Sequence, residues 1–321
     1  MSFVHENAEE LADLVQIVAG ERGLRRSIVE KDYWVTHTLW ALSKSGLDVW
    51  FKGGTSLSKG FGIIERFSED LDLKIEPGAV TALPHVSNWK SDRSRPTSER
   101  RAFFEQLPAH VAIPDCRVEL ELDTTDKLWR NANLRVVYPG LFLAELPAEV
   151  SGSVRLEVGN ARVTPHVTRP ITSWIHDKLA STNLLAAYQD NRAAGVRCVH
   201  PFVTLIEKLD ALHRRFPNER SAPAMFVRHY EDVARLIDAV STLPPLDGYP
   251  AVRALADEML AQRQIVAMPS ADDPALAPTD NARWDGLRSA HAAIGDMFWG
   301  PRLSLEDASA RIRSWIAATL C

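Results

Sequence analysis

The apolar positions in the first half of the chain switch repeatedly between helical and strand-like spacing. Residues 7–18 and 27–43 repeat apolar side chains at helical intervals. Residues 47–54 are a short apolar run that ends in two glycines, which is typical of a buried strand. Residues 69–76 alternate polar and aliphatic side chains, which predicts a second strand with one polar face.

Three more segments with strand-like alternation follow a predicted helix near residues 99–111. They occupy residues 116–123, 133–139 and 153–159. Because a βαβ repeat would place a helix after each strand, this arrangement predicts instead an α+β fold with a mixed sheet. The remaining pattern is helical apart from GVRCVH at residues 195–200, with candidate helices at residues 171–187, 202–215, 224–240, 251–265, 285–298 and 304–319. We therefore expect a sheet domain over residues 1–170 and a helical domain over residues 171–321.

Composition narrows the class of protein. The 321 residues are 45% hydrophobic and 25% charged, as in an ordinary globular protein. No apolar run approaches the ~18 residues of a membrane span, and the N-terminus lacks the basic and apolar regions of a secretory signal. Cys116, Cys198 and Cys321 lie far apart, which fits a reducing compartment better than a disulfide framework. We expect a cytoplasmic protein with no membrane partner.

The charge distribution offers one local basic segment. The net charge of −5 gives the whole chain no basic character that would suit nucleic acid. Residues 90–101, however, contain five cations and two acids. Composition alone favours a solvated loop, and a contact to a nucleic-acid backbone is the alternative.

Two aspartates, Asp70 and Asp72, give the first chemical signal. Residues two apart on a strand point to the same face, so their carboxylates repel unless a proton or a cation intervenes. Magnesium prefers hard oxygen ligands and usually leaves positions for water or substrate phosphate. The pair alone is a weak signal, because the same spacing occurs by chance on solvated strands.

A glycine pair precedes the aspartates by about sixteen residues. Gly53 and Gly54 allow a ligand to approach the backbone, and Thr55 and Ser56 open a predicted short helix whose N–H groups suit phosphate. Lys59 adds a nearby cation, although the residue order of a Walker A loop is absent. Taken alone, these residues are better explained as a tight turn with a hydroxyl cap. The turn and the carboxylate pair together are much more specific than either one.

Several segments of the chain resemble one family in the order of its motifs. They are GGTSLSK with FSEDLDL after it, IVEKDYWVTHTLWAL at residues 28–42, VRLEVG at 154–159, HPFVTLIEKLDALHRR at 200–215 and VRHYEDVARLI at 227–237. This pattern resembles the AbiEii/AbiGii-type nucleotidyltransferase toxins, a branch of the DNA polymerase β-like superfamily. The resemblance implies a polymerase-β-like nucleotidyltransferase sheet flanked by helices, with a helical C-terminal domain.

The resemblance also implies a metal site. Asp70 and Asp72 would bind Mg²⁺, and Glu157 would be the third carboxylate, helping to bind metal or accepting a proton from the attacking hydroxyl. Glu119 and Glu121 lie on the polar face of another predicted strand. The sequence leaves open which of the three glutamates reaches the metal.

By the same resemblance, the turn residues Gly53, Gly54, Thr55 and Ser56 would hold the triphosphate of a bound nucleotide. Lys208 would neutralise its charge, and Asp232 would orient that lysine or the nucleotide, so that the helical domain contributes both to the cleft. The residues alone suggest a snorkelling surface lysine at position 208, and an exposed helix acid at 232 paired with Arg228 or Arg235.

The implied activity is transfer of a nucleoside monophosphate from a nucleoside triphosphate to an RNA acceptor. The 3′ end of tRNA is the leading acceptor. The protein would then be the toxin of a toxin–antitoxin pair, with a cognate antitoxin protein as a partner. Two alternatives stay open: a protein hydroxyl as the acceptor, or a non-catalytic nucleotide-binding regulator.

Overall fold

The computed structural model describes residues 1–68, 70–147, 150–218 and 222–320. The chain divides into two compact units. The first consists of Met1–Gly60, Phe67–Val163 and Thr168–Cys198, and the second of Phe61–Arg66, Thr164–Val167 and Val199–Cys321. The chain therefore passes repeatedly from one unit to the other.

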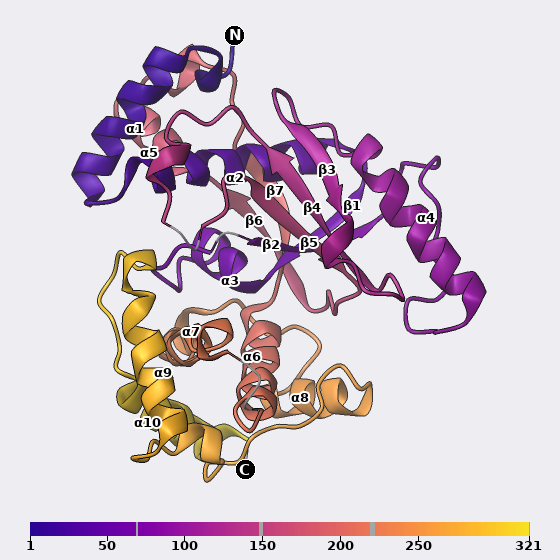
Figure 1. The fold of residues 1–321 in the computed structure, drawn as a ribbon, viewed down its shortest axis with the longest axis vertical. Helices are drawn as coiled ribbons and strands as arrows, with labels where there is room; N and C mark the ends of the chain where they lie inside the picture. Colours follow the sequence, from indigo (N-terminus) through magenta and orange to yellow (C-terminus); the bar gives the residue numbers. More distant parts are fainter. Residues whose placement is uncertain (69, 148–149, 219–221, 321) are drawn as a thin grey trace. The chain divides into compact units, whose positions relative to one another are not determined.

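A mixed sheet of seven strands, counted over the described residues, forms the centre of the first unit (Figure 1). The strands are β1 Asp48–Lys52, β2 Asp70–Glu76, β3 Arg117–Glu121, β4 Asn131–Val137, β5 Val154–Gly159, β6 His166–Ile171 and β7 Ala193–Val199. Their order across the sheet is β3-β4-β5-β2-β1-β7-β6. β1 is antiparallel to β2 and parallel to β7, and β2 is parallel to β5. The strands that flank the glycine turn are thus neighbours in the middle of the sheet.

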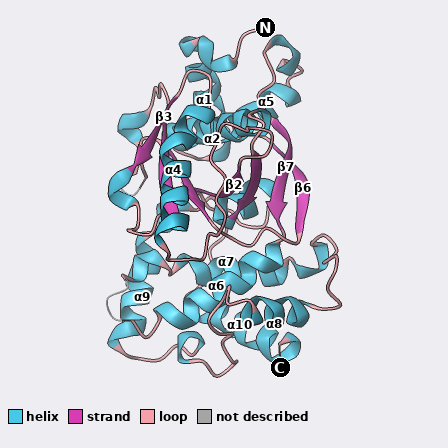
Figure 2. Ribbon diagram, turned by 90° about the vertical axis from the view of Figure 1, so that its right-hand side faces the viewer, coloured by secondary structure: helices cyan, strands magenta, loops and turns pink. Residues whose placement is uncertain are grey.

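Helices accompany this sheet in the first unit, as Figure 2 shows in cyan beside the magenta strands. Helices α1 (Ala8–Arg22), α2 (Arg26–Lys44) and α5 (Trp174–Ser181) pack against one another, and α2 also contacts β5. Helix α4 (Ser94–His110) packs against β3. Helices α2 and α4 therefore pack on the sheet, and α1 and α5 pack on α2.

Helix α2 is buried along most of its length, and its polar residues fasten it to the loops around the sheet. Trp34 is 1% exposed in its core-facing position. The Glu30 carboxylate accepts a hydrogen bond of 2.6 Å from the N–H of Leu141, and the Lys31 ammonium donates one of 2.6 Å to the carbonyl of Ser151. Buried charges are tolerated when they are paired or hydrogen-bonded in this way. The helix is therefore a fixed support for the sheet.

The second unit is mainly helical. It contains α6 (Pro201–Arg215), α7 (Arg228–Asp238), α8 (Val252–Ala261), α9 (Ala282–Ala293) and α10 (Leu305–Thr319). Helix α7 packs against α6 and α10. The segment Phe61–Arg66 belongs to this unit because the N–H of Trp299 donates to the carbonyl of Glu65, and Arg66 forms a β-bridge with Phe298.

The predicted α+β architecture, with a mixed sheet and a helical C-terminal part, is confirmed. The boundary at residue 170 is not the one observed: residues 171–198 belong to the sheet unit, because α5 packs on α1 and α2 and β7 pairs with β1. Strand β6 was not predicted. It contains Pro170 and lies at the edge of the sheet, where proline is tolerated. No helix among the described residues has the length and apolar character to cross a bilayer.

Candidate active site

The glycine pair directly follows β1 and forms a tight turn. Gly53–Thr55 is a single helical turn (α3), and Ser56–Gly60 continues it as a π-helical turn. Gly53 has a φ of 75°, a left-handed conformation that glycine adopts at little cost. A β-carbon at Gly53 would lie 1.7 Å from Oδ2 of Asp72. The Asp72 carboxylate therefore packs directly on the backbone of the turn, and only glycine fits there.

Thr55 fastens this turn to the start of β2. Its hydroxyl lies 2.7 Å from the carbonyl oxygen of Asp70 and 3.0 Å from that of Ser68, to which it donates. Thr55 and Ser56 are only 3% and 1% exposed. Their side chains thus serve the fold, and a ligand at this turn would meet its backbone before it met these hydroxyls.

Asp70 and Asp72 lie on the same face of β2, as their spacing predicted. The alternating residues Leu71 and Leu73 are 0% and 2% exposed, and they face the core. The register pairs Asp72 with Glu157 on β5. Neighbouring strands lie about 4.8 Å apart, so the Asp72 and Glu157 side chains stand side by side on one face.

The two other candidate glutamates lie farther from this pair. Both are on β3, which β4 and β5 separate from β2, at about 14 Å for three strand spacings. Glu119 contacts Arg117 and Arg135 at 2.5 and 2.7 Å, and hydrogen bonds from Arg135 and Arg117 lower the pKa of Glu119. Glu121 lies 3.5 Å from Arg155, whose guanidinium is in turn 3.7 Å from Asp70. Of the three glutamates, the register brings Glu157 next to Asp72.

A cavity of about 320 Å³ opens beside this carboxylate pair. Asp72, Glu157 and Lys52 line it together with asparagines. These asparagines are Asn131 and Asn133 of β4 and Asn160, which follows β5. The sequence prediction did not include them. Their signal is the alternation of Asn131 and Asn133 with the apolar residues of a strand, which marks a polar face but no chemistry.

The carboxylates match the ligand chemistry of Mg²⁺, which takes hard oxygen donors. Asp70, Asp72 and Glu157 present three carboxylates on one face. Among the described residues, however, no group of three histidine, cysteine or acidic side chains converges on one metal position. Magnesium often uses one or two carboxylates and completes its shell with substrate phosphate and water. The donor set therefore fits a site that a bound polyphosphate would complete.

Lys59 does not extend from the turn toward a ligand. Its ammonium forms an ion pair with Asp32 of α2, and both side chains are nearly buried, at 11% and 6% exposed. The second oxygen of Asp32 accepts a hydrogen bond of 3.0 Å from the N–H of Trp174 at the start of α5. Lys59 thus ties the glycine turn to the helices behind the sheet.

Lys208 and Asp232 meet in the second unit. The Lys208 ammonium lies 2.8 Å from Oδ2 of Asp232, and Arg66 makes a two-pronged contact to the same carboxylate at 2.7 Å on each oxygen. Arg66 and Asp232 are each 1% exposed. The lysine is therefore no snorkelling surface residue, and the aspartate is no exposed helix acid. Arg66 was missed because its partner lies 166 residues away.

The surroundings of this cluster set its protonation. Burial raises the pKa of Asp232, but Arg66 and Lys208 outweigh that effect and hold it well below its usual range. Burial and, next to it, Lys208 keep the pKa of His229 well below 6.5. Neutral His229 then lies 3.2 Å from the lysine through Nδ1, where it can accept a hydrogen bond. A buried cation is thereby held between a carboxylate and an imidazole.

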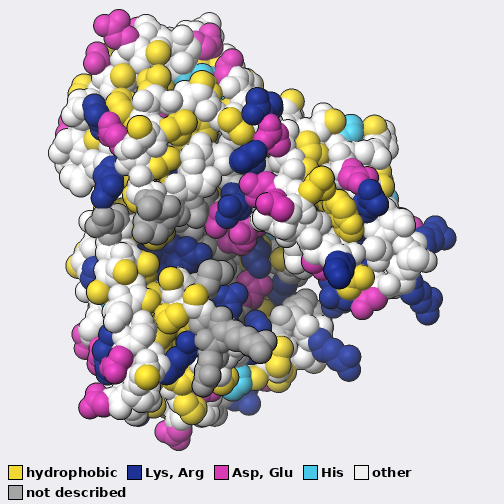
Figure 3. All heavy atoms as spheres, in the orientation of Figure 1, with side chains coloured by type: hydrophobic (Ala, Val, Ile, Leu, Met, Phe, Trp, Pro, Cys, Tyr) yellow, Lys and Arg dark blue, Asp and Glu magenta, His cyan; other side chains and the backbone are white. Residues whose placement is uncertain are grey.

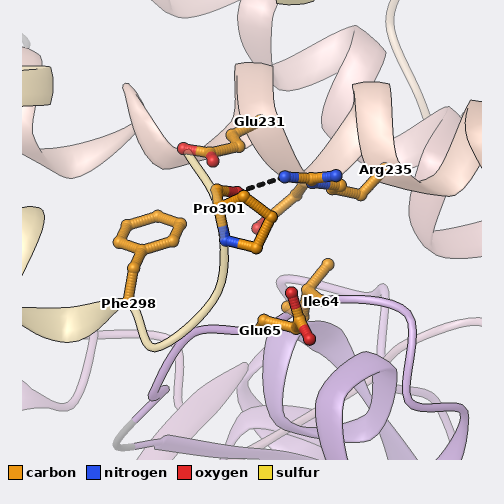
Figure 4. A pocket seen from close by; sticks show the side chains of 7 residues that line it. Ile64, Glu65, Glu231, Arg235, Phe298 and Pro301 are labelled. Atoms are coloured by element: carbon orange, nitrogen blue, oxygen red, sulfur yellow. Dashed lines mark hydrogen bonds between the residues drawn. The ribbon is translucent and has the colours of Figure 1, made fainter. Parts of the chain in front are cut away.

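Asp232 also lines a small pocket. Figure 4 shows this pocket from close by. Ile64, Glu65, Phe298 and Pro301 line it, and Arg235 closes one side by donating to the carbonyl of Pro301. Its volume of about 10 Å³ admits at most a water molecule. This pocket is not a nucleotide site.

The family described as nucleotidyl transferase AbiEii toxin, type IV TA system, matches residues 38–304. The chain belongs to this family. The matched span includes both the carboxylate strands and the Lys208–Asp232 pair. A search of curated proteins found no match.

Membership of the AbiEii family makes the chain a nucleotidyltransferase toxin of a toxin–antitoxin system. It implies a nucleoside triphosphate as substrate and an antitoxin as partner. The likeness inferred from the motifs of the sequence is therefore confirmed at the level of the family.

The basic segment of this AbiEii family member lies around the start of α4. Dark-blue side chains project at the right-hand edge of Figure 3, where Figure 1 places α4. Lys90, Arg93, Arg95 and Arg101 are exposed. Arg100 is not: it is 0% exposed and donates to the carbonyls of Leu128, Asn88 and Ser91. Arg100 thus holds the neighbouring loops against α4 from inside the protein, and the other four cations of the segment face solvent.

Proposed function

We propose that the protein is an Mg²⁺-dependent enzyme that transfers a nucleoside monophosphate from a nucleoside triphosphate to RNA, with the 3′ end of tRNA as the leading acceptor. The observation that carries this proposal is the contact between Gly53 and Asp72. It joins a turn of the phosphate-binding type to a carboxylate, and Glu157 stands beside that carboxylate in register. The reaction would take place in the cytoplasm, where both substrates occur.

Asp70, Asp72 and Glu157 would hold the divalent ion, which supplies positive charge to the reacting phosphate and the leaving group. The acceptor hydroxyl oxygen forms a bond to the α-phosphorus. The bond from that phosphorus to the bridging oxygen breaks, and pyrophosphate leaves with the electron pair. Glu157, which is exposed whereas both aspartates are half-buried, would accept the hydroxyl proton.

The turn would hold the triphosphate through the backbone N–H groups of Gly54 and Thr55, since the two hydroxyls are buried. The N–H of Ser56 already donates to the carbonyl of Gly53. Lys208 would neutralise triphosphate charge, and Asp232 would fix its position; these two roles rest on the family's motifs. Lys59 would act indirectly, by holding the turn against Asp32. The work of the protein is then mostly positioning and electrostatic stabilisation.

Support for an RNA acceptor comes from the exposed cations near the start of α4. Phosphate contacts from lysine and arginine supply most of the non-specific affinity for nucleic acid. Lys90 and Arg93 are exposed. Arg95 and Arg101 pair with Glu99 and Glu105 on the same helix, and exposed pairs of this kind exchange readily for other partners because they are weak.

The transfer reaction itself tests the proposal. Purified protein, Mg²⁺ and each α-labelled nucleoside triphosphate are incubated separately with total RNA and with a protein extract. We expect labelled RNA, and we expect Asp72→Asn to remove at least about 99% of the label, as for loss of a metal ligand. Glu119→Gln is the matched control, because it changes a carboxylate on the same sheet that is bound by two arginines.

Three results would contradict the proposal. Label that persists in Asp72→Asn would exclude the carboxylate site. Label in proteins and not in RNA would assign the acceptor to a protein hydroxyl. Tight binding of triphosphate without transfer to either pool would make the chain a nucleotide-binding regulator.

A further inference from the structure

The cavity beside Asp72 and Glu157 contains a group of neutral amides with no assigned role. Asn131, Asn133 and Asn160 all line it. The register places Asn133 directly opposite Glu157, one strand farther from Asp72. Asn131 pairs with Gly159, where a β-carbon would lie 2.0 Å from its Oδ1. The Asn131 side chain therefore lies over the backbone of β5, and the absence of a side chain at position 159 makes room for it.

These amides differ from the polar groups in the adjacent row of the same face. In that row, Arg155 contacts Asp70, and Arg135 contacts Glu119. Arg155 also lies 3.5 Å from Glu121, which stands opposite Asn133. Within the described residues, by contrast, no side-chain hydrogen bond to another protein group occupies Asn131, Asn133 or Asn160. Each amide has both donors and acceptors to offer. The amides that line the cavity with Asp72 and Glu157 can therefore still form hydrogen bonds with a ligand.

The position of the cavity along the strands indicates which ligand it faces. The glycine turn lies at the start of β2, where Thr55 donates to the carbonyl of Asp70. The cavity lies at the other side of Asp72, because Leu73, Val158 and Gly159 line it. In phosphoryl transfer the attacking and leaving oxygens lie roughly in line on opposite sides of phosphorus. With the leaving pyrophosphate at the turn, the attacking hydroxyl comes from the side of the cavity.

We propose that Asn131, Asn133 and Asn160 bind the terminal ribonucleoside of the RNA acceptor and present its hydroxyl to Glu157. This inference rests on the function proposed above and adds to it the residues that select the acceptor. A ribose 2′-hydroxyl both donates and accepts, so a carboxamide can pair with it, and this hydroxyl is what distinguishes RNA from DNA at a site. Asparagine also pairs with base edges.

The cavity suits a nucleoside better than an amino-acid side chain. Its volume of about 320 Å³ lies in the range of small-molecule pockets. A serine or threonine side chain would fill little of it and would leave the three amides without partners. A nucleoside offers several polar groups for the amides and one hydroxyl for the carboxylate. The observed lining therefore favours an RNA end over a protein hydroxyl.

The first experiment distinguishes an effect on binding of the RNA acceptor from an effect on binding of the nucleoside triphosphate. Steady-state transfer to tRNA is measured for the full-length wild type, Asn131→Ala, Asn133→Ala and Gln189→Ala. Gln189 is an exposed amide outside the cavity and serves as the matched control. We expect the KM for tRNA to rise about tenfold in each asparagine variant, as for one lost hydrogen bond to a bound polar group. The KM for the nucleoside triphosphate and all constants of the control should stay within about twofold.

A second readout uses binding without catalysis. The affinity of each variant for tRNA and for tRNA that ends in 2′-deoxyribose is measured in the absence of triphosphate. The wild type should prefer the ribose end by about tenfold, and Asn133→Ala should lose most of that preference. Because these positions are half-buried or exposed, unfolding is not expected, and thermal melts check it.

Each outcome supports or contradicts the assignment of the three asparagines to the RNA acceptor. If the wild type labels tRNA but the asparagine variants keep its KM and its ribose preference, the amide assignment is wrong and the proposed function stands. A rise in the KM for the triphosphate instead of tRNA would assign the cavity to the nucleotide. If the wild type labels proteins or nothing, the proposed function and this inference both fail.

Discussion

At the scale of single residues, Gly53 is subject to two independent structural constraints that exclude a side chain. Its φ of 75° is unfavourable for any residue with a β-carbon, and that β-carbon would collide with Asp72. Gly23 has a similar φ of 65° but nothing within 4 Å of its missing β-carbon. The two positions therefore separate backbone strain from the collision with the carboxylate.

We expect Gly23→Ala to lower the free energy of unfolding by about 1–2 kcal/mol, the cost of an L-residue in the left-handed region. Gly53→Ala should lower it by at least as much, because the collision with Asp72 adds to that strain. Only Gly53→Ala should lower nucleotide transfer, by about a hundredfold, because displacement of a reacting group by about 1 Å costs that much. Urea unfolding and transfer rates measure the two effects. Equal transfer rates in the two variants would show that Asp72 is not positioned by this contact.

Asp232 is the second residue with a large predicted effect. It is the carboxylate between Arg66 and Lys208, and all three side chains are almost fully buried. Asp232→Ala should destabilise the protein by about 3–5 kcal/mol, because two buried cations lose their partner. Glu105→Ala removes the exposed partner of Arg101 and should change the free energy of unfolding by less than about 1 kcal/mol. Urea denaturation of both variants checks this; similar values would contradict the buried cluster.

At the scale of elements, a network of histidines joins the N-terminal segment to α2 and α5. His5 lies 2.7 Å from the Tyr33 hydroxyl, and Asn191 lies 2.8 Å from His37 and 2.7 Å from His176. Burial lowers the pKa of all three histidines, and that of His37 falls to about 4. The folded protein therefore favours the neutral rings.

This network predicts a loss of stability in mild acid. The folded-state pKa of His37 is below its unfolded value of 6.5, so its contribution is complete above pH 6.5 and decreases as the pH falls toward 4. We expect the free energy of unfolding to decrease by about 2 kcal/mol from pH 7 to pH 5 through His37 alone. Urea titrations at pH 7, 6 and 5 measure it, and His37→Gln should reduce the slope. An unchanged slope in that variant would contradict the burial effect.

At the scale of elements, the sequence predicted the strands of the carboxylate site and their polar faces but not how the strands pair. The alternation around Asp70 and Asp72 and the glycine stop after β1 are local patterns, so the strands and their polar faces followed from spacing. The pairing of Asp72 with Glu157 depends on the register of strands about eighty residues apart, which no local pattern contains. Lys59 looked like a phosphate ligand because Asp32, its partner, lies on a distant helix. Asparagines on a strand carry no chemical signature until a cavity forms beside them.

At the scale of the whole molecule, the candidate residues divide between two units. The turn and the carboxylates belong to the first, and Lys208 and Asp232 belong to the second. The short segment Phe61–Arg66, which joins the turn to the aspartate strand, also belongs to the second unit, where Arg66 binds Asp232. The segment that connects the glycine turn to β2 therefore packs with the helical unit.

In the proposed function, Asp72 and its neighbouring carboxylates bind a divalent ion together with a triphosphate at the glycine turn. Calorimetric titration with a nucleoside triphosphate that has a methylene group between the α- and β-phosphorus measures this without turnover. We predict that Mg²⁺ strengthens binding to the wild type by at least about tenfold, or ~1.4 kcal/mol, and that Asp72→Asn removes this gain. Equal affinity of the wild type with and without Mg²⁺ would contradict the claim.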